Sequence, residues 1–142
     1  MAEVKLDILA VAAHPDDAEL SCSGTIYKHK LQGKKVGILD LTLGELGSRG
    51  NSELRKQEAM ASAEILGLDA RVMLDLGDGF FEITEQSLKE VITHIRRFRP
   101  EIVLCNAIED RHPDHARASQ LVSRACFLSG LVKVETVFQD KM

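Results

Sequence analysis

The sequence predicts an α/β fold, with a Rossmann-like, doubly wound and mainly parallel sheet that carries helices on both faces. Apolar runs alternate with helical patterns along the whole chain, and short loops join them. This alternation is typical of a parallel sheet with right-handed crossovers. The 142 residues, 44% of them hydrophobic and 28% charged, show no repeat or linker. We therefore expect residues 1–142 to form a single globular domain.

The first strand is expected over residues 6–13, which are apolar except for Asp7. Such a continuous apolar run is typical of a central parallel strand that is covered on both faces. A helix is expected from residue 17 to about residue 32, with Gly33 as its stop. Four apolar residues are expected near one face of this helix: Leu20, Ile26, Tyr27 and Leu31.

The second strand is expected over residues 34–43. The eight residues that follow, 44–51, contain three glycines. Such a loop must bend sharply or approach something closely. Asn51 or Ser52 can cap the next helix, which is expected to run to Leu66.

The third strand is expected over residues 71–76. The Gly-Asp-Gly at residues 77–79 resembles part of a dinucleotide-binding fingerprint but lacks its third glycine, so we interpret it as a turn. The next helix is capped by Thr84 and ended by Pro100, and its apolar residues recur at helical spacing. Its last turn contains a cluster that we expect to be solvated: Arg96, Arg97 and Arg99.

The fourth strand is expected over residues 101–107, and a helix follows over about 114–128. Residues 131–138 could add a fifth strand, which gives a strand order of about 3-2-1-4-5. In this order strands one and four are neighbours and start helices on opposite faces. A crevice therefore opens at their carboxyl ends, where ligands bind in such sheets.

Both strands that border this crevice end in a His-Pro-Asp sequence. Residues 12–19 read Ala-Ala-His-Pro-Asp-Asp-Ala-Glu, and residues 110–115 read Asp-Arg-His-Pro-Asp-His. Buried carboxylates must be paired, hydrogen-bonded or bound to a metal. Two histidines and one carboxylate commonly hold catalytic zinc with one position left open, and the same ligands suit non-haem iron.

The spacing within the motifs separates possible ligands from other groups. If both prolines occupy first helical positions, His14 and His112 lie at strand–helix corners. Asp17 and His115 then follow at i+3, on the same side of each turn. Successive helical side chains diverge by about 100°, so the neighbouring Asp16 would reach a water rather than the metal.

Together with the loop between them, these motifs resemble the PIG-L/LmbE-like zinc-dependent de-N-acetylases. The third motif reads Gly-Glu-Leu-Gly-Ser-Arg-Gly at 44–50, followed by Glu-Leu-Arg-Lys-Gln-Glu-Ala at 53–59. The resemblance runs from Asp7 to about Val137. Within the family the chain is most similar to the bacillithiol-biosynthesis deacetylases, which act on N-acetylglucosaminyl malate. Since family members usually run further, the resemblance implies a domain that lacks the usual C-terminal part.

The resemblance also implies roles for individual residues. The ligands of Zn2+, or of another divalent metal such as Fe2+, would be His14, Asp17 and His115. The catalytic residues would be the general base Asp16, the oxyanion-facing His112, and Asp114, which would hold His112. The substrate contacts would be Arg55 and three residues of the glycine-rich loop, Glu45, Ser48 and Arg49.

The implied reaction is hydrolysis of a sugar acetamide by a water that zinc activates and Asp16 deprotonates. Two alternatives stay open: a metal-dependent amidase of a thiol conjugate, and a non-catalytic metal-binding domain. A phosphoesterase would more often show a cluster of basic residues near the site. The motif loops carry only Arg49, Arg55 and Arg111, which argues against that activity. The expected partner is thus a small sugar-amide substrate.

Charge and composition exclude other partners. The net charge of −4 and the pI near 5.7 argue against nucleic acid and anionic membranes. No apolar run approaches the roughly 20 residues that span a bilayer, and the N-terminus lacks the pattern of a signal peptide. The three cysteines have no metal-binding spacing and read as buried thiols of a cytoplasmic protein. A homo-oligomeric state stays open.

Overall fold

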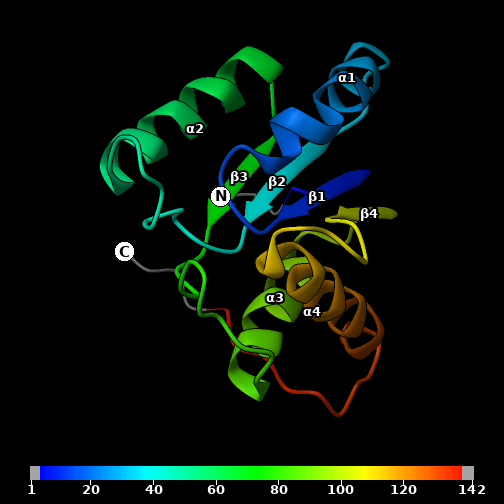
Figure 1. Ribbon diagram of the computed structural model, residues 1–142. Helices are drawn as coiled ribbons and strands as arrows, with labels where there is room; N and C mark the ends of the chain where they lie inside the picture. The colour runs from blue at the N-terminus through cyan, green and yellow to red at the C-terminus, as the bar shows by residue number, and fades with distance from the viewer. Residues whose placement is uncertain (1–3, 139–142) are drawn as a thin grey trace.

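The structure, a computed structural model that describes residues 4–138, is a parallel sheet of four strands between two helical layers (Figure 1). In chain order the strands are β1 (Ile8–Ala12), β2 (Val36–Asp40), β3 (Ala70–Met73) and β4 (Ile102–Cys105). The helices are α1 (Asp17–Leu31), α2 (Ser52–Leu66), α3 (Glu85–Phe98) and α4 (Pro113–Ser129). The strand order is β3-β2-β1-β4, and all three pairings are parallel. The predicted α/β fold and the order 3-2-1-4 are confirmed.

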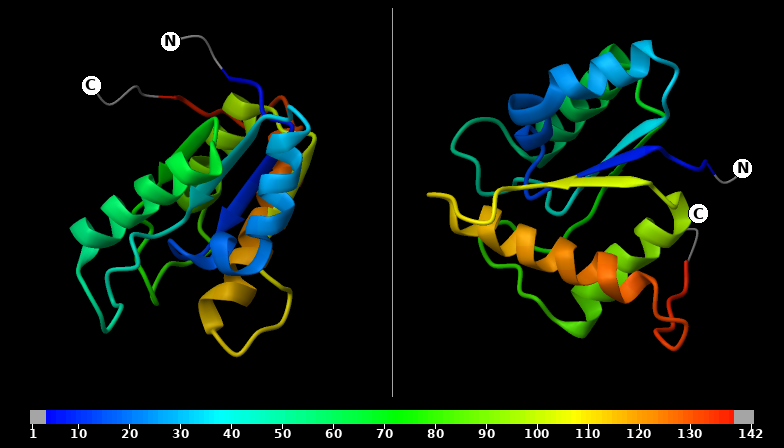
Figure 2. Two further views of the ribbon diagram at one scale, coloured as in Figure 1. Left: turned by 90° about the horizontal axis from the view of Figure 1, so that it is seen from above. Right: turned by 90° about the vertical axis from the view of Figure 1, so that its right-hand side faces the viewer.

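The sheet is covered on both faces, with α1 and α2 on one side and α3 and α4 on the other (Figure 2). The larger apolar core lies between the sheet and the α3–α4 layer, and a smaller core lies under α1. Every residue of β1 is buried, as predicted for a central strand. In the described part of the chain, each helix is too short or too polar to cross a bilayer.

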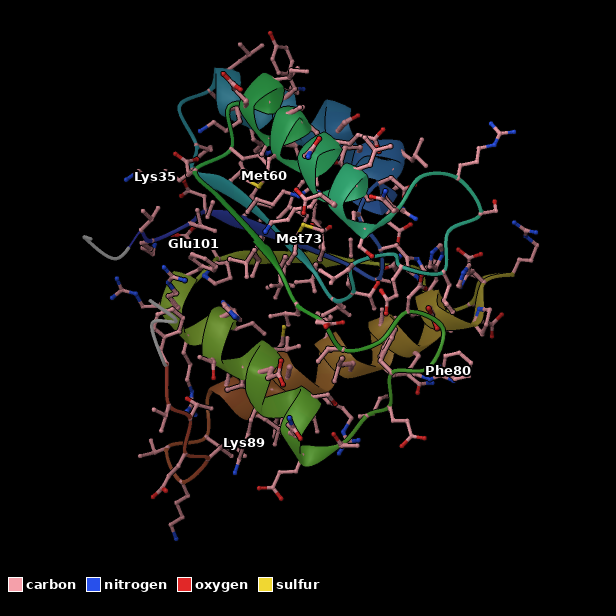
Figure 3. All side chains as sticks on the ribbon, turned by 90° about the vertical axis from the view of Figure 1, so that its left-hand side faces the viewer. Lys35, Met60, Met73, Phe80, Lys89 and Glu101 are labelled. Carbon is pink, nitrogen blue, oxygen red and sulfur yellow. The ribbon has the colours of Figure 1, made fainter. Side chains whose placement is uncertain are left out.

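The loops that follow the strands all lie at one end of the sheet. Figure 3 shows Lys35 and Glu101, which precede β2 and β4, at one end of the molecule, and Phe80, which follows β3, at the other. β1 pairs with β2 on one side and with β4 on the other. The segments after these three strands are therefore neighbours, as the doubly wound order requires.

The prediction that the four apolar residues of α1 lie near one face is wrong. Leu20, Tyr27 and Leu31 are 84%, 51% and 72% exposed, whereas Ile26 is fully buried. Cys22 has non-helical backbone angles that kink α1, so the regular spacing of 100° per residue does not hold from Leu20 to Ile26. The stripe that faces the sheet contains Ile26 and the small Ala18, whose size lets the helix pack closely.

The predicted fifth strand over residues 131–138 is also wrong, because this segment is irregular. Its backbone carbonyls are bound by Arg96 instead of a neighbouring strand. The guanidinium donates to the carbonyl oxygens of Leu131 and Val134 at 2.9 and 2.6 Å, and to Thr136 Oγ1 at 3.0 Å. Arg96 is therefore a tether between α3 and the C-terminal segment rather than a solvated helix end.

A buried ion-pair network joins α1 and α2 to the sheet. The side chain of Arg71 in β3 is fully buried, and its Nε donates to Asp40 Oδ2 at 2.9 Å. Its Nη1 contacts Glu19 in α1 and donates to the carbonyl oxygen of Ala59 in α2 at 3.1 Å. This network fixes the first turn of α1, which directly follows the His-Pro-Asp-Asp sequence.

Candidate metal centre

The two His-Pro-Asp motifs meet at the carboxyl ends of β1 and β4. The ring centroid of His112 lies 4.7 Å from that of His14 and 4.8 Å from that of His115. One ring nitrogen from each of these histidines lies within 4.8 Å of those of the other two. The fold therefore brings together side chains from the two ends of the chain at the crevice that the topology predicts.

The carboxylate of Asp17 lies between two of the histidines. Its Oδ2 atom is 3.5 Å from His14 Nδ1 and 3.3 Å from His115 Nε2. Tetrahedral coordination with bonds of about 2.0–2.1 Å places neighbouring ligand atoms about 3.3 Å apart. Both distances from Asp17 are near this value. Two other groups of donor atoms in the described residues also lie close enough together to hold an ion, namely His14, His112 and His115, and His14, Asp78 and Asp114.

Asp17 is held in place by the ends of both strands. Its Oδ2 accepts the backbone N–H of His14 at 3.0 Å and the side-chain amide of Asn106 at 3.1 Å. The other end of that amide, Asn106 Oδ1, accepts the backbone N–H of Ala13 at 2.9 Å. Burial alone would raise the pKa of Asp17, but the hydrogen bonds with His14 and Asn106 lower this pKa to about 2. Asp17 is consequently a carboxylate that is ready to accept a cation.

Two carboxylates orient the ring of His14, which is 7% exposed. Its Nε2 lies 2.8 Å from Asp114 Oδ2 and 3.0 Å from Asp78 Oδ1. A proton on Nε2 directs the Nδ1 lone pair toward Asp17, an arrangement that is usual for metal-binding histidines. Burial disfavours the cation, but hydrogen bonds with Asp17 and Asp114 raise the pKa of His14 to about 9. A bound metal would displace the extra proton from Nδ1.

The carboxylate of Asp114 contacts His14 and not His112, the residue that Asp114 was expected to hold. The link is instead a backbone one, in which the N–H of Asp114 donates to His112 Nδ1 at 3.2 Å. Because Nδ1 accepts this bond, a neutral His112 ring carries its proton on Nε2. Asp114 Oδ2 accepts the backbone N–H of Gly79 at 2.8 Å, which ties the loop after β3 to the site.

His115 is oriented from the other side by Asp110. Asp110 Oδ2 lies 2.8 Å from His115 Nδ1, which leaves Nε2 of that ring to face Asp17. The hydrogen bond with His115 lowers the pKa of Asp110. Pro113 begins α4 and His112 caps it, as the sequence predicted for this second motif.

Asp16 has a backbone conformation that is rare for any residue except glycine. It caps α1 with φ 122° and ψ −25°, so the helix begins at Asp17 and the expected helical position of Pro15 is wrong. Its side chain is 57% exposed, whereas that of Asp17 is 13% exposed. Burial of part of its surface raises the pKa of Asp16, although the charge of Arg55 acts against this. Strained residues of this kind concentrate at functional sites.

A polar cavity of about 500 Å³ opens beside Asp16, between the start of α1, the 44–50 loop and α2. Three of the four predicted substrate contacts line it: Ser48, Arg49 and Arg55. Glu45 does not line this cavity, because its Oε1 accepts the backbone N–H of Asp78 at 2.7 Å.

Three supporting residues of the site were not found from the sequence. Asp78 lies in the Gly-Asp-Gly that we interpreted only as a turn, and its Oδ2 also accepts the backbone N–H of Leu46 at 2.8 Å. Asn106 is a single polar residue at the end of an apolar strand. Asp110 opens the second motif, yet nothing in its spacing shows that it contacts His115. Asn106 directly follows β4, whereas Asp78 and Asp110 each lie five residues after the end of a strand, in the loops after β3 and β4.

Comparison with known proteins identifies the family of this chain. Residues 9–126 match the family described as PIG-L: GlcNAc-PI de-N-acetylase. The chain is 37% identical over 134 residues to the diacetylchitobiose deacetylase of Thermococcus kodakarensis, covering 87% of this chain and 50% of that protein. It is 31% identical over 130 residues to the 4-oxalmesaconate hydratase of Pseudomonas putida, covering 82% and 50%.

A solved structure is also similar throughout. The conserved protein TT1542 from Thermus thermophilus superposes with a TM-score of 0.88 at 43% sequence identity, covering 94% of this chain and 61% of that one. The chain spans about half the length of the curated relatives named above.

Proposed function

Because the chain belongs to the GlcNAc-PI de-N-acetylase (PIG-L) family, we propose that it is a metal-dependent N-deacetylase of N-acetylated sugar conjugates. The observation that carries this proposal is the position of Asp17 Oδ2, which lies 3.5 Å from His14 Nδ1 and 3.3 Å from His115 Nε2. A second carboxylate, Asp16, lies beside this group at the edge of a polar cavity. Together these features provide a metal site, a base and room for a substrate.

The proposed ligands are His14, Asp17 and His115, and the proposed ion is Zn2+, although Fe2+ suits the same donors. A divalent ion held there would act as a Lewis acid on the acetamide carbonyl and would lower the pKa of a water. Three protein ligands would leave such an ion one position for water or substrate.

Asp16 is the proposed general base. Its carboxylate is more exposed than that of Asp17, and partial burial raises its pKa. It can therefore take the proton of a water that attacks the acetamide carbonyl. The same carboxyl group, now protonated, can give this proton to the leaving nitrogen, so that the products are acetic acid and the amine, which ionise to acetate and ammonium in water.

His112 is the proposed donor to the developing oxyanion. Since its Nδ1 accepts the N–H of Asp114, the proton of the neutral ring is on Nε2 and can be donated to negative charge on the carbonyl oxygen. A preorganised donor of this kind typically contributes about 10²–10³ in kcat. Ser48, Arg49 and Arg55 border the cavity in which we place the sugar.

A metal-titrated assay of acetate release tests the function. Substrates would include N,N'-diacetylchitobiose, N-acetylglucosaminyl malate and the N-acetyl form of a thiol conjugate. Metal-dependent acetate release from a sugar conjugate supports the proposal, and the preferred conjugate identifies the class of substrate. Release from the thiol conjugate alone would favour the amidase alternative.

The same protein preparation separates the remaining alternatives. We expect about one divalent ion per chain by elemental analysis, because the possible donor sets all include His14. Incubation with 4-oxalmesaconate, monitored by loss of its ultraviolet absorbance, tests for the activity after which the Pseudomonas putida relative is named. One bound ion without turnover of any of these compounds would leave a non-catalytic metal-binding domain.

A further inference from the structure

Arg55 lies in the first turns of α2 and is enclosed by backbone. Its side chain is 19% exposed. Its Nη2 donates to the carbonyl oxygen of Pro15 at 2.7 Å, and its Nη1 donates to that of Gly44 at 3.1 Å. The guanidinium therefore joins the peptide directly before Asp16 to the start of the glycine-rich loop.

Two glycines make room for this guanidinium. A Cβ atom at Gly44 would lie 2.7 Å from Arg55 Cζ, and one at Gly47 would lie 2.6 Å from Arg55 Nη1. Gly44 also has φ +64°, a conformation that glycine adopts without strain. The glycines of this loop thus form a slot for an internal side chain, which accounts for their presence without a ligand.

The residue next to this anchor is the strained one. Asp16 has φ 122°, and conformations of this kind persist only when the surroundings hold them. Arg55 binds the carbonyl oxygen of Pro15, which belongs to the peptide unit that sets φ of Asp16. Its Nη2 also lies 3.5 Å from Asp16 Oδ2. One guanidinium therefore holds both the backbone and the carboxylate of Asp16.

We infer that Arg55 is a positioning residue that sets the direction of the Asp16 carboxylate, rather than a cation reserved for the substrate. This inference rests on the proposed function insofar as Asp16 is the base. Two carbonyl oxygens already occupy donors of Arg55, whereas Arg49 is exposed in the same cavity. Arg49 is the arginine that remains available to a substrate.

The kinetic test compares Arg55→Ala and Arg55→Lys with Arg49→Ala. Arg55→Ala should lower kcat by about 10- to 100-fold, as for a misplaced catalytic group, with KM changed less than about threefold. Lys cannot reproduce the two-pronged contact, so Arg55→Lys should not restore kcat. Arg49→Ala should raise KM and leave kcat nearly unchanged. A raised KM with an unchanged kcat in Arg55→Ala would overturn the inference.

The close packing of Gly47 against Arg55 gives a second test, which measures stability and does not require an activity assay. Gly47→Ala should lower the unfolding midpoint by several degrees in the native chain, because its Cβ collides with Arg55. In the Arg55→Ala background the same substitution should have little effect, so the two changes are coupled. Gly24→Ala, where a Cβ meets nothing within 4 Å, is the matched control. Additive effects of Gly47→Ala and Arg55→Ala would overturn the slot.

Backbone amide spectra then separate positioning from general stability. In Arg55→Ala, the ¹H–¹⁵N signals of Asp16 and Asp17 should shift, and those of α3 should stay in place. Unmoved signals at Asp16 would overturn the inference whether or not the chain is active. Absence of acetate release by the native chain, with these shifts and the coupling present, would instead count against the proposed function alone.

Discussion

The Nε2 atom of His14 lies 2.8 Å from Oδ2 of Asp114, a contact between residues 100 positions apart in the chain. Asp114 is fully buried, and the same Oδ2 atom also accepts the N–H of Gly79 at 2.8 Å. The contact with Asp114 fixes which nitrogen of His14 faces Asp17. If His14 binds the proposed ion, the affinity for metal should depend on Asp114 as well.

Asp114→Asn is therefore expected to weaken zinc binding by about 10- to 100-fold, as is typical when the partner of a metal-binding histidine is changed. The amide keeps the size of the side chain but is a weaker acceptor for the His14 ring. Competition with a chromophoric chelator measures the affinity. Asp75→Asn, on an exposed residue after β3, is the control. Equal zinc affinity in Asp114→Asn and the native chain would contradict this prediction.

Asp16 and Asp17 should respond differently to the same substitution. Asp16→Asn should retain the metal and lose about 10²–10⁴ in kcat, as for a missing general base. Asp17→Asn should lose metal, with activity partly restored at high zinc, because Asp17 lies between His14 and His115. Metal content and kcat of both variants test the assignment. Metal lost in Asp16→Asn and kept in Asp17→Asn would show that the two roles are reversed.

The backbone of Asp16 predicts a gain in stability from a change that removes the proposed base. At φ 122° a glycine is unstrained, whereas an alanine keeps the strain. Asp16→Gly should therefore be more stable than Asp16→Ala by about 1 kcal/mol, although glycine elsewhere destabilises relative to alanine. Urea unfolding of the two variants measures the difference. If Asp16→Ala were more stable than Asp16→Gly, the positive φ of residue 16 would carry little strain.

Arg71 should be among the most sensitive positions for folding. Burial raises the pKa of Asp40 to about 6 even though Arg71 lies beside it. Arg71→Met would leave this carboxyl group buried without its partner, at an expected loss of about 3–5 kcal/mol in unfolding free energy. Arg124→Met, at an exposed site of α4, should change stability by no more than about 0.5 kcal/mol. Similar losses in the two variants would argue against the network.

His94 should make the fold sensitive to acid. Burial, with the charge of Arg97, lowers the pKa of His94 to about 4, below its ordinary value of 6.5. The unfolded chain thus takes up a proton more readily than the folded one. The stability from the neutral ring is complete above about pH 6.5 and is lost as pH falls toward 4.

At about pH 5 this difference amounts to roughly 2 kcal/mol. His94→Phe should remove this part of the pH dependence of unfolding, because Phe98 and Phe138 already surround the ring. His29→Gln, on α1, is the control. An unchanged slope of stability against pH in the mildly acidic range in His94→Phe would contradict the assignment.

Sequence patterns predicted the features of this protein that follow from hydrophobic periodicity and from the order of strands, helices and motifs along the chain. The apolar run of β1, the alternation of strands and helices and the repeated His-Pro-Asp give the sheet order and bring His14 to His115. Patterns could not predict which stripe of α1 is buried. Small residues such as Ala18 carry a weak hydrophobic signal, but their size lets a helix approach a sheet.

Contacts between segments that are distant in the chain also could not be predicted from sequence patterns. The last segment looks like a strand, but the guanidinium of Arg96 binds its carbonyls. Asp78 looks like a turn residue, because nothing near it in the chain shows that His14 lies 3.0 Å away. The glycines at 44 and 47 were expected to permit a sharp bend or a close approach, and the structure shows that the side chain they approach is Arg55 from α2.

The order β3-β2-β1-β4 also governs when the site can form during synthesis. β1 is made first, yet its partner β4 and the carboxylate that orients His14 arrive about 100 residues later. At about 5–20 residues per second, a ribosome needs roughly 5–20 s to supply them. Throughout that interval the nascent chain exposes an apolar central strand and has no complete ligand set. Capture of the proposed metal would thus report the step in which the segment after β4 closes on the segment after β1.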